Sequence, residues 1–549
     1  MPRPAHRNSS LYFNYPHYDF VAPPELAGGA LTHDVAIVGG GPVGLTAALE
    51  LARHGVSSVL LEEKDTVNEG SRAICIARHS LEIMQQLGIS DRFVRKGLGW
   101  THGTSYYGTR PVYRLAMPHS EQERFLPMYN LQQQYVEQFL VDAAANNARI
   151  DLRWQSRLAG IEIANTDATL IVETPQGSYP LRARHVIAAD GARSTVRSKL
   201  GLRLKGDAYE GCYVIADVRM RSDYPTERRA FFDSPGNPGS TVLIHRQPDD
   251  IWRIDYQLAA GASELEALAE ANVVRRVSAI LAMIGEQGPW ELEWWSLYKA
   301  YTLALDDYRH GPVLFAGDAA HLVPIFGVRG LNSGLADAMN AAWKLAYVIR
   351  GWAPANLLAS YSSERRGATM EVFELAARST QFMTPPTRGF ALMRDAALAL
   401  AVHDDATRPL INPRQSQPYT YAASPLTGFA ARDREFSAGP CAGAAIVNRR
   451  LGAGRFLLDA LGPGFSGMYF SKTGEVPAQV RALCDDLGVG NEPFALIVIE
   501  DTATFTAYGA DEGTFYLVRP DRHVAARWRQ IRADEVRRAL QQSLGETER

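Results

Sequence analysis

The residues best suited to chemistry lie in three separated segments, and the first is a glycine-rich turn. An apolar run over residues 35–38 leads into a turn that contains Gly39, Gly41, Pro42 and Gly44, and a helical pattern follows. Gly39 permits a tight turn, Gly41 admits a phosphate close to the backbone, and Gly44 lets helix and strand pack closely. The N–H groups at the start of such a helix would face an anion. This segment therefore predicts a pyrophosphate site.

Two carboxylates support this prediction. A second apolar run, residues 58–61, ends at Glu62 and Glu63. A carboxylate at the end of the second strand of a nucleotide-binding unit accepts hydrogen bonds from a ribose diol. The alternative is a glycine-rich strand, turn and helix that binds no ligand. The position of the acids favours an adenosine dinucleotide, which would be NAD or FAD.

The second and third segments place one aspartate each after a predicted strand. Asp190 follows the strand predicted over 185–189, and Asp318 follows the buried strand predicted over 313–316. Asp190 and its neighbouring glycine also form a common turn dipeptide, so this segment alone is ambiguous. The prediction of a dinucleotide site therefore depends on the three segments taken together.

These segments resemble the aromatic-ring hydroxylases, FAD-dependent monooxygenases that include the p-hydroxybenzoate, phenol and 3-(3-hydroxyphenyl)propionate hydroxylases. The similarity runs from about residue 12 to the C-terminal end, and it is densest over 317–324, which ends at Pro324, and over 330–338. The resemblance implies that FAD is the cofactor and that NADH or NADPH is the co-substrate. It also implies that Asp318 contacts the ribityl chain.

The segment after residue 329 is expected to open a helix beside the flavin. The resemblance implies that backbone N–H groups of Gly330, Leu331 and Asn332 face the flavin pyrimidine ring. A helix reaching about Arg350 is predicted from the residues themselves, with Asn332 or Ser333 as its cap. Its N-terminus would stabilise negative charge on a reduced flavin.

Three further cofactor contacts follow from the resemblance. Arg72 matches an arginine beside the FAD pyrophosphate and ribityl chain, and a solvated loop arginine is the alternative. Gln133 matches a glutamine near the flavin, although a solvated amide on a helix face would look the same. Asp190 matches a motif that is assigned to both flavin and nicotinamide binding.

The resemblance also implies the reaction. NAD(P)H reduces FAD, O2 adds at flavin C4a, and the resulting hydroperoxide hydroxylates a phenolic ring ortho or para to an existing hydroxyl. The protein must then exclude water, orient the ring and help the phenol lose its proton. Epoxidation, Baeyer-Villiger insertion and oxidative dearomatisation would use the same fold, and an FAD-binding protein without turnover is a further alternative. The tryptophan-containing signature of the flavin halogenases is absent from the sequence.

Three charged residues are candidates for this catalytic work. Arg253 and Asp255 are alternate residues of the strand predicted over 252–258, so they share one face. Asp255 replaces a tyrosine of the phenol hydroxylases and could act as a base, but an ion pair with Arg253 is favoured. Arg329 replaces the glutamine usual in the family. Three alternatives are open for this arginine: it anchors an anionic substrate, stabilises reduced flavin, or faces solvent. Cys75 is expected to be a packing residue.

Composition is that of a globular enzyme with no nucleic-acid or membrane partner. The 549 residues carry a net charge of −3, which gives no basic field for nucleic acid. The four cysteines are far apart and form no metal-binding pattern, so reduced thiols in the cytoplasm are expected. Residues 1–33 lack the apolar core of a signal peptide, and no apolar run is long enough to span a bilayer.

The pattern of elements predicts an α/β fold in which a Rossmann-like FAD domain is discontinuous, with a β-sheet substrate domain inserted. Its parts are expected over 34–204, with a substrate-side segment at about 100–130, and over 301–402. The sheet is expected over 205–300, an N-terminal extension over 1–33 and a linker over 403–440. Residues 441–549 resemble the thioredoxin-like C-terminal domain of the phenol hydroxylases, without its Cys-x-x-Cys motif. Packing or assembly, for example into a homodimer, is its expected role.

Overall fold

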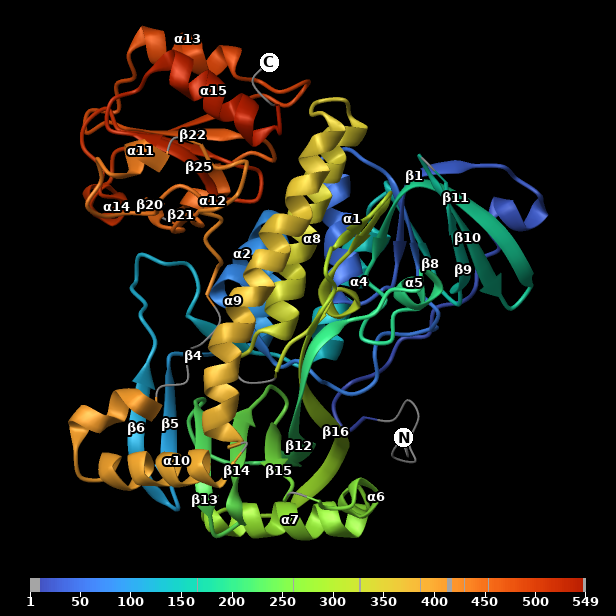
Figure 1. Ribbon diagram of the computed structural model, residues 1–549, viewed down its shortest axis with the longest axis vertical. Coiled ribbons are helices and arrows are strands. Elements are labelled where there is room, and N and C mark those ends of the chain that lie inside the picture. The colour runs from blue at the N-terminus through green and yellow to red at the C-terminus, as the bar shows by residue number, and fades with distance from the viewer. Residues whose placement is uncertain are drawn as a thin grey trace.

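The computed structural model describes residues 10–164, 166–259, 261–324, 327–385, 387–411, 417–428, 430–452 and 454–546. Parts of the expected N-terminal extension and linker, residues 1–9, 412–416 and 429, therefore lie outside the described residues. Figure 1 shows one sheet at the right, a second sheet at the bottom, and a C-terminal unit at the upper left. Two long helices, α8 (Gly330–Ile349) and α9 (Ala359–Met383), run through the middle.

The first sheet is mainly parallel, as a doubly wound fold requires. Its strands follow the order β17-β18-β11-β1-β2-β8, with β10 and β9 added antiparallel beside β11. The bounds are β1 (Thr32–Val38), β2 (Ser58–Leu61), β8 (Ile150–Arg153), β9 (Arg157–Ile163), β10 (Ala168–Thr174), β11 (Gly177–Ala188), β17 (Arg309–His310) and β18 (Val313–Phe315). Strand β1 lies near the centre because its residues 35–38 are apolar and buried on both faces.

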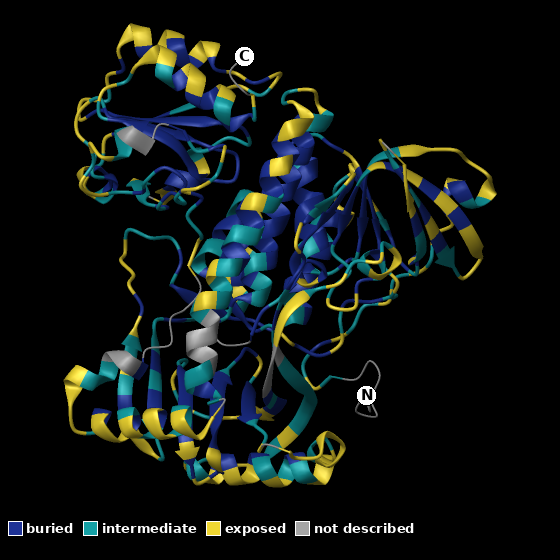
Figure 2. Ribbon diagram, in the orientation of Figure 1, coloured by how far each residue is buried: buried dark blue, intermediate teal, exposed yellow. Residues whose placement is uncertain are grey.

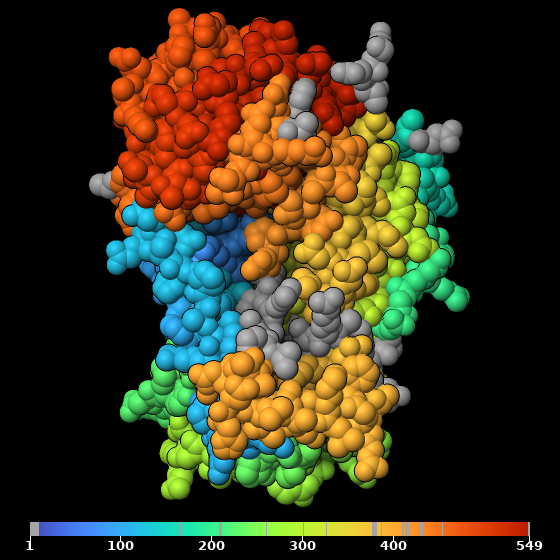
Figure 3. All heavy atoms as spheres, turned by 60° about the vertical axis from the view of Figure 1, so that its left-hand side comes forward, coloured from blue at the N-terminus to red at the C-terminus, as the bar shows by residue number. Residues whose placement is uncertain are grey.

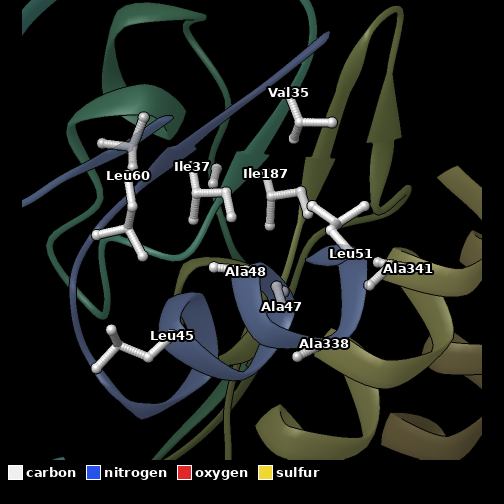
Figure 4. Packing of buried hydrophobic residues seen from close by; sticks show 14 of the residues in the cluster. Val35, Ile37, Leu45, Ala47, Ala48, Leu51, Leu60, Ile187, Ala338 and Ala341 are labelled. Atoms are coloured by element: carbon white, nitrogen blue, oxygen red, sulfur yellow. The ribbon is translucent and has the colours of Figure 1, made fainter. Parts of the chain in front are cut away.

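Small residues let two helices approach this sheet closely. Helix α1 (Pro42–Arg53) packs between the sheet and α8, and Figure 4 shows Ala47 and Ala48 of α1 near Ile37 and Ile187, with Ala338 of α8 on its far side. Alanines at these contacts bring the helix axes close without leaving voids. The other helices of this part are α2 (Arg78–Gln86), α3 (Ser90–Lys96), α4 (Gln133–Ala145) and α5 (Thr195–Lys199), with the 3-10 turns η1 (Pro24–Ala27), η2 (Gly317–Ala319) and η3 (Ala355–Leu358).

The second sheet gathers strands from three distant parts of the chain. Its order is β19-β16-β12-β15-β14-β13-β5-β6. The bounds are β5 (His102–Tyr107), β6 (Arg110–Ala116), β12 (Lys205–Met220), β13 (Arg228–Ser234), β14 (Asn237–Arg246), β15 (Ile251–Gln257), β16 (Trp290–Ala304) and β19 (His321–Leu322). Strand β5 pairs parallel with β13, so the segment near residue 100 belongs to this sheet.

The two faces of the second sheet have different neighbours. One face packs its apolar residues against α7 (Glu270–Met283), and the other packs against α10 (Arg388–Ala401) and the end of α9. Figure 2 shows that the outer surfaces of α7 and α10 are exposed, whereas the strands between them are largely buried. A short sheet of β3 (Cys75–Ala77), β7 (Met128–Asn130) and β4 (Leu98–Trp100) connects the two parts. Helix α6 (Glu264–Ala267) and the 3-10 turn η4 (Asp405–Ile411) complete this half.

The C-terminal unit is a small mixed sheet with helices on it. Its strand order is β23-β22-β24-β25, in which β22 and β23 are parallel and β24 is antiparallel to both of its neighbours. Figure 3 shows this unit, in orange and red, seated on one end of the molecule. The bounds are β20 (Arg450–Gly452), β21 (Arg455–Phe456), β22 (Ser466–Phe470), β23 (Ala495–Ile499), β24 (Phe515–Val518), β25 (Val524–Trp528), α11 (Ala430–Asp433), α12 (Leu457–Ala460), α13 (Ala478–Asp486), α14 (Thr502–Tyr508) and α15 (Ala533–Ser543).

Buried charges join the C-terminal unit to the central helices. Arg519 donates hydrogen bonds of 2.6 and 2.9 Å to Glu364 of α9, which also accepts one of 2.7 Å from Lys344 of α8. Burial alone would raise the pKa of Glu364, but the two cations hold it well below its usual range. The unit is thus fixed to the rest of the chain by ion pairs that water does not reach. None of the helices in the described ranges is long and apolar enough to cross a membrane.

Candidate active site

The glycine turn has the geometry that a pyrophosphate requires. Gly39 has a φ of 107°, and a Cβ there would lie 2.5 Å from the carbonyl oxygen of Ala189. A Cβ on Gly44 would lie 2.0 Å from the carbonyl oxygen of Gly39, so close packing excludes a side chain at both positions. A Cβ on Gly41 would meet no atom within 4 Å. The backbone at Gly41 therefore borders open space in front of the α1 N-terminus, which Pro42 begins.

Glu62 lies beside this turn at the end of β2. Its carboxylate accepts hydrogen bonds from the backbone N–H groups of Gly40, at 2.7 Å, and Lys64, at 3.1 Å. Burial raises the pKa of Glu62, and these bonds and the Lys64 cation oppose that rise. Each carboxylate oxygen keeps a lone pair for a further donor such as a ribose hydroxyl. Glu63 is exposed to solvent.

The fold brings the three separated segments together at the start of α1. Gly39 packs against residues 189 and 190 of the second segment. A Cβ on Gly317 would lie 3.0 Å from a methyl group of Val43, and one on Gly334 would lie 2.7 Å from a methyl group of the same valine. The glycines of the third segment therefore let α8 and η2 reach the glycine turn. All three segments consequently border one site.

Two aspartates and two arginines surround this site. Asp318 is exposed to solvent. Desolvation by the surrounding protein raises its pKa, and His321, Arg72 and Arg197 act to lower it. Asp190 accepts a hydrogen bond of 3.0 Å from the N–H of Val196, so it helps to cap α5. Arg72 is exposed, and its position near Asp318 places a cation at the same edge. These residues suit a ligand with both hydroxyl groups and phosphates.

Gln133 orders the loop that carries Arg72. Its Oε1 atom accepts hydrogen bonds of 3.3 Å from the N–H groups of Arg72 and Ala73, and its Nε2 atom donates one of 2.7 Å to Glu137. The alternative of a solvated amide is therefore wrong. Its helix, α4, starts at this residue, and the side chain turns back onto the loop rather than into solvent.

Asn332 lies at the start of α8 but does not cap it. Its Oδ1 atom accepts hydrogen bonds from the N–H of Ala77, at 2.9 Å, and from Ser80 Oγ, at 2.7 Å. Its Nδ2 atom donates to the carbonyl oxygens of Cys75, at 3.1 Å, and Val328, at 2.7 Å. The expected cap is thus wrong: the helix begins at Gly330 after Arg329 without a side-chain cap, because Asn332 binds β3 and α2 instead. The first N–H groups of α8, from Gly330 to Asn332, keep no partner within the helix.

The expected ion pair between Arg253 and Asp255 is wrong. Arg253 instead donates hydrogen bonds of 2.8 Å to both carboxylate oxygens of Asp217. Asp217 lies directly opposite Arg253 on the neighbouring strand β12, whereas Asp255 is two residues further along β15. Arg253 also donates to the carbonyl oxygens of Ser71 and Arg72, so it fastens the Arg72 loop to the second sheet. Arg253 thus fixes the position of the Arg72 loop.

Asp255 is buried without a cation bound to it. Its Oδ1 atom has no hydrogen-bond partner within the described part of the chain. Burial raises the pKa of Asp255 to about 7, with Arg253 acting to lower it and Asp217 to raise it. A carboxyl group with this pKa can gain or lose a proton near neutral pH. The group therefore suits proton transfer with a bound ligand.

Arg329 and Cys75 border the same region. The Arg329 side chain is only 2% exposed, so the alternative that it faces solvent is wrong. Burial lowers its pKa to about 10, which leaves it a cation at neutral pH. Pro324, on the chain before it, is also buried. Burial raises the pKa of the Cys75 thiol to about 12, and the thiol donates a hydrogen bond of 3.1 Å to Asn130, as suits a packing residue.

Three polar residues of this region were missed by the sequence reasoning. Asp217, Arg228 and His245 all lie on the second sheet and are buried. Asp217 and His245 are isolated polar residues in otherwise apolar strands, and such a residue signals a buried partner. Arg228 begins its strand next to another arginine, and its sequence context carries no comparable signal.

A family model described as FAD binding domain matches residues 32–376 of the chain. The chain is 29% identical over 481 residues to a 3-(3-hydroxy-phenyl)propionate/3-hydroxycinnamic acid hydroxylase of Burkholderia cenocepacia (strain HI2424), which covers 87% of this chain and 83% of that protein. It is 27% identical over 379 residues to the para-nitrophenol 4-monooxygenase of Pseudomonas sp. (strain WBC-3), covering 68% of this chain and 90% of the relative.

Solved structures share the fold. The flavin-dependent monooxygenase PieE, solved in complex with FAD and substrate, superposes with a TM-score of 0.76 at 23% sequence identity. The superposition covers 94% of this chain and 100% of that one. It therefore includes the C-terminal unit as well as both larger sheets.

Proposed function

The chain belongs to the FAD binding domain family and is a flavin-dependent monooxygenase, and from this premise we propose that it hydroxylates a phenolic substrate ortho or para to an existing hydroxyl. NADH or NADPH and O2 are the co-substrates. The observation that carries the proposal is Asp255, a buried carboxyl without a hydrogen-bond partner at Oδ1 on the sheet that faces the cofactor site. The relatives named for phenolic substrates support the same substrate class.

The residues present fit FAD. We assign its pyrophosphate to Gly39, Gly41, Pro42 and Gly44, because the backbone there borders open space and a helix N-terminus. Glu62 and Glu63 are proposed for the adenosine ribose. Asp318, Asp190 and Arg72, whose loop Gln133 orders, are proposed for the ribityl and pyrophosphate region. Pro324 and the N–H groups of Gly330, Leu331 and Asn332 are proposed for the flavin ring. Bound FAD supplies electron transfer from NAD(P)H and the activation of O2.

Asp255 is proposed as the group that accepts the phenol proton. An ionised hydroxyl makes an aromatic ring more electron-rich and thus more easily hydroxylated. With a pKa of about 7, Asp255 is partly ionised at neutral pH and can take this proton without a large energetic cost. The apolar side chains around it keep water away from the ring during the reaction.

The two arginines have different proposed roles. Arg253 is a positioning residue, because it holds the Arg72 loop and contacts Asp217 rather than the reacting region. Arg329 directly precedes α8, so its buried cation adds to the positive end of the helix dipole. The Arg329 cation would favour negative charge on a reduced flavin at this site, whereas Asp217 neutralises the charge of Arg253.

We also propose the domain division that the sequence suggests, with the FAD domain interrupted by the second sheet. Residues 441–549 are proposed to be thioredoxin-like, which is supported by the strand order of the sheet and by the antiparallel direction of β24. A cytoplasmic location is proposed because all four cysteines are free thiols. A homodimer is proposed only as an assembly to test.

The test is a purification with FAD followed by a screen of phenols. A substrate should accelerate NAD(P)H oxidation with little H2O2 release, and isotopically labelled O2 should place one labelled oxygen atom in a new ring hydroxyl. Insertion of that atom into a ring bond or an epoxide would replace hydroxylation with another oxygenation. NAD(P)H oxidation that no compound accelerates would contradict the proposal.

A further inference from the structure

We infer that the substrate carries a carboxylate in addition to its phenolic hydroxyl and that Arg228 binds this carboxylate. The inference rests on the proposed function, because it concerns the ligand of the same site. It starts from a row of polar residues on the face of the second sheet that turns away from α7.

The register of the strands places these residues side by side. Arg228 of β13 lies next to His245 of β14, because its neighbour Arg229 pairs with Ile244. His245 in turn pairs with Arg253 of β15, and Arg253 pairs with Asp217 of β12. Side chains on adjacent strands in register lie on the same face of a sheet. The row therefore contains two arginines and one carboxylate.

The carboxylate, Asp217, is paired with one of the two arginines, Arg253. Asp217 accepts two hydrogen bonds from Arg253 and one of 3.1 Å from Gln247. His245 cannot supply a second negative charge, and burial together with Arg228, Arg253 and Arg229 lowers its pKa to about 3. The histidine is neutral at the pH of the cell.

Arg228 is consequently a buried cation without an anion. It is 9% exposed, and no described residue accepts a hydrogen bond from its guanidinium. Burial lowers its pKa to about 10, and the Cys75 thiol, which acts to raise it, is itself neutral at the pH of the cell. An uncompensated guanidinium costs several kcal/mol when it is desolvated. A bound oxyanion would remove this cost and use the planar donor fork.

The surroundings fit an aromatic ligand of defined length. Asp255 lies on β15, two strands from Arg228 and two residues further along, which is about 12 Å between Cα atoms at the usual strand spacing and rise. A hydroxylated ring with a short acidic side chain spans this distance between a proton acceptor and a cation. The walls near Cys75 are apolar and consist of Ile74, Trp100, Met117 and Met128, with Leu115 and Val328 packed on them.

Arg229 provides a matched control on the same strand. It is also buried, at 2% exposure, but it points to the other face of the sheet and stacks on the ring of Tyr224 with 3.5 Å between guanidinium carbon and ring centre. The R228M and R229M variants remove the same charge from adjacent positions on opposite faces. The R228K variant retains the positive charge but loses the planar pair of N–H donors that a guanidinium offers to a carboxylate.

The experiment measures binding of matched ligands to the FAD-loaded enzyme through the change in flavin absorbance. The probes are 3-(3-hydroxyphenyl)propionate and its amide, and 3-hydroxybenzoate and its amide. We expect at least one acid to bind about 10- to 100-fold more tightly than its amide, as a hydrogen-bonded charge pair provides. R228M should abolish this preference, chiefly by weakening acid binding, R228K should restore part of it, and R229M should keep it.

Equal binding of acid and amide by the wild-type enzyme, or the absence of acid binding, would overturn the inference. So would a preference that R228M and R229M reduce to the same extent. If R228M does not fold, the comparison of acid with amide in wild type and R228K decides. Tight binding of an acid that neither accelerates NAD(P)H oxidation nor becomes hydroxylated would overturn the proposed function while leaving the Arg228 assignment intact.

Discussion

Arg253 of β15 donates hydrogen bonds of 2.8 Å to both carboxylate oxygens of Asp217 on the neighbouring strand β12. The same guanidinium holds the carbonyl oxygens of the loop that carries Arg72. This pair therefore joins the second sheet to the edge of the nucleotide site. Because Arg253 pairs with Asp217, it does not pair with Asp255, and the carboxyl group of Asp255 can gain or lose a proton near neutral pH.

The R253M variant tests this connection. It leaves Asp217 buried without its cation, which should lower the free energy of unfolding by about 3–5 kcal/mol. It should also weaken FAD binding, because the Arg72 loop loses two hydrogen bonds. Thermal unfolding of the apoprotein and FAD titration measure the two effects separately. R219M is the control, since Arg219 donates a hydrogen bond to the carbonyl oxygen of Leu11 at the surface, and equal effects of both variants would contradict the assignment.

A second prediction concerns the pH dependence of Asp255. Its pKa is about 7 in the folded protein, whereas an aspartate in an unfolded chain titrates near pH 4. Between these pH values the folded state holds a proton that the unfolded state has lost, so the contribution of Asp255 to stability falls as pH rises. In D255N this fall should disappear from the pH profile of the free energy of unfolding.

The same titration should control activity. Since the carboxylate form accepts the phenol proton, kcat/KM should rise as pH increases through about 7. D255N should lower kcat/KM about 100-fold or more and flatten this part of the profile. The exposed Asp223 offers the control variant D223N. A wild-type profile that is flat between pH 6 and pH 8 would exclude Asp255 as the base.

Two glycines of the turn should respond differently to alanine. The methyl group of G41A meets no protein atom, so the apoprotein should keep its stability while FAD binding weakens, because the methyl occupies the space proposed for phosphate. The methyl group of G44A would lie 2.0 Å from the carbonyl oxygen of Gly39 and should cost about 1–3 kcal/mol or more in stability. Apoprotein melting and FAD titration separate these outcomes. Undiminished FAD affinity in G41A would contradict the pyrophosphate assignment.

Local features could be predicted from the sequence, whereas the partners of a residue on adjacent strands could not. Gly39, Gly41 and Gly44 could be assigned because each role depends on a few adjacent residues and on a repeating strand, turn and helix pattern. The alternation of residues also predicted that Arg253 and Asp255 share a face. It could not predict Asp217 as the partner, because the register between β12 and β15 is set by contacts far apart in the chain. The attachment of β5 to β13 depends on such contacts too.

Arg329 can be tested by restoring the glutamine usual in the family. R329Q removes a buried cation next to the first turn of α8. The reduced flavin carries more negative charge than the oxidised form, so loss of the cation should lower its reduction potential by about 30 mV, equivalent to about 1.4 kcal/mol for two electrons. Potentiometric titration with a reference dye measures this shift. R350Q, at the other end of the helix, is the control, and an unchanged potential in R329Q would remove Arg329 from the flavin site.

The last prediction concerns Arg519, which bridges the C-terminal unit and α9. It binds Glu364 and Asp521, both of which are buried, so R519M leaves Asp521 without its arginine and Glu364 with Lys344 in place of two cations. We expect a loss of about 3–5 kcal/mol. Because this loss falls on the contact between the units, calorimetry should resolve two unfolding transitions in R519M where the wild type has one. R537M removes an arginine from the exposed face of α15 and should keep a single transition. Two transitions already present in the wild type would show that the ion pairs do not couple the units.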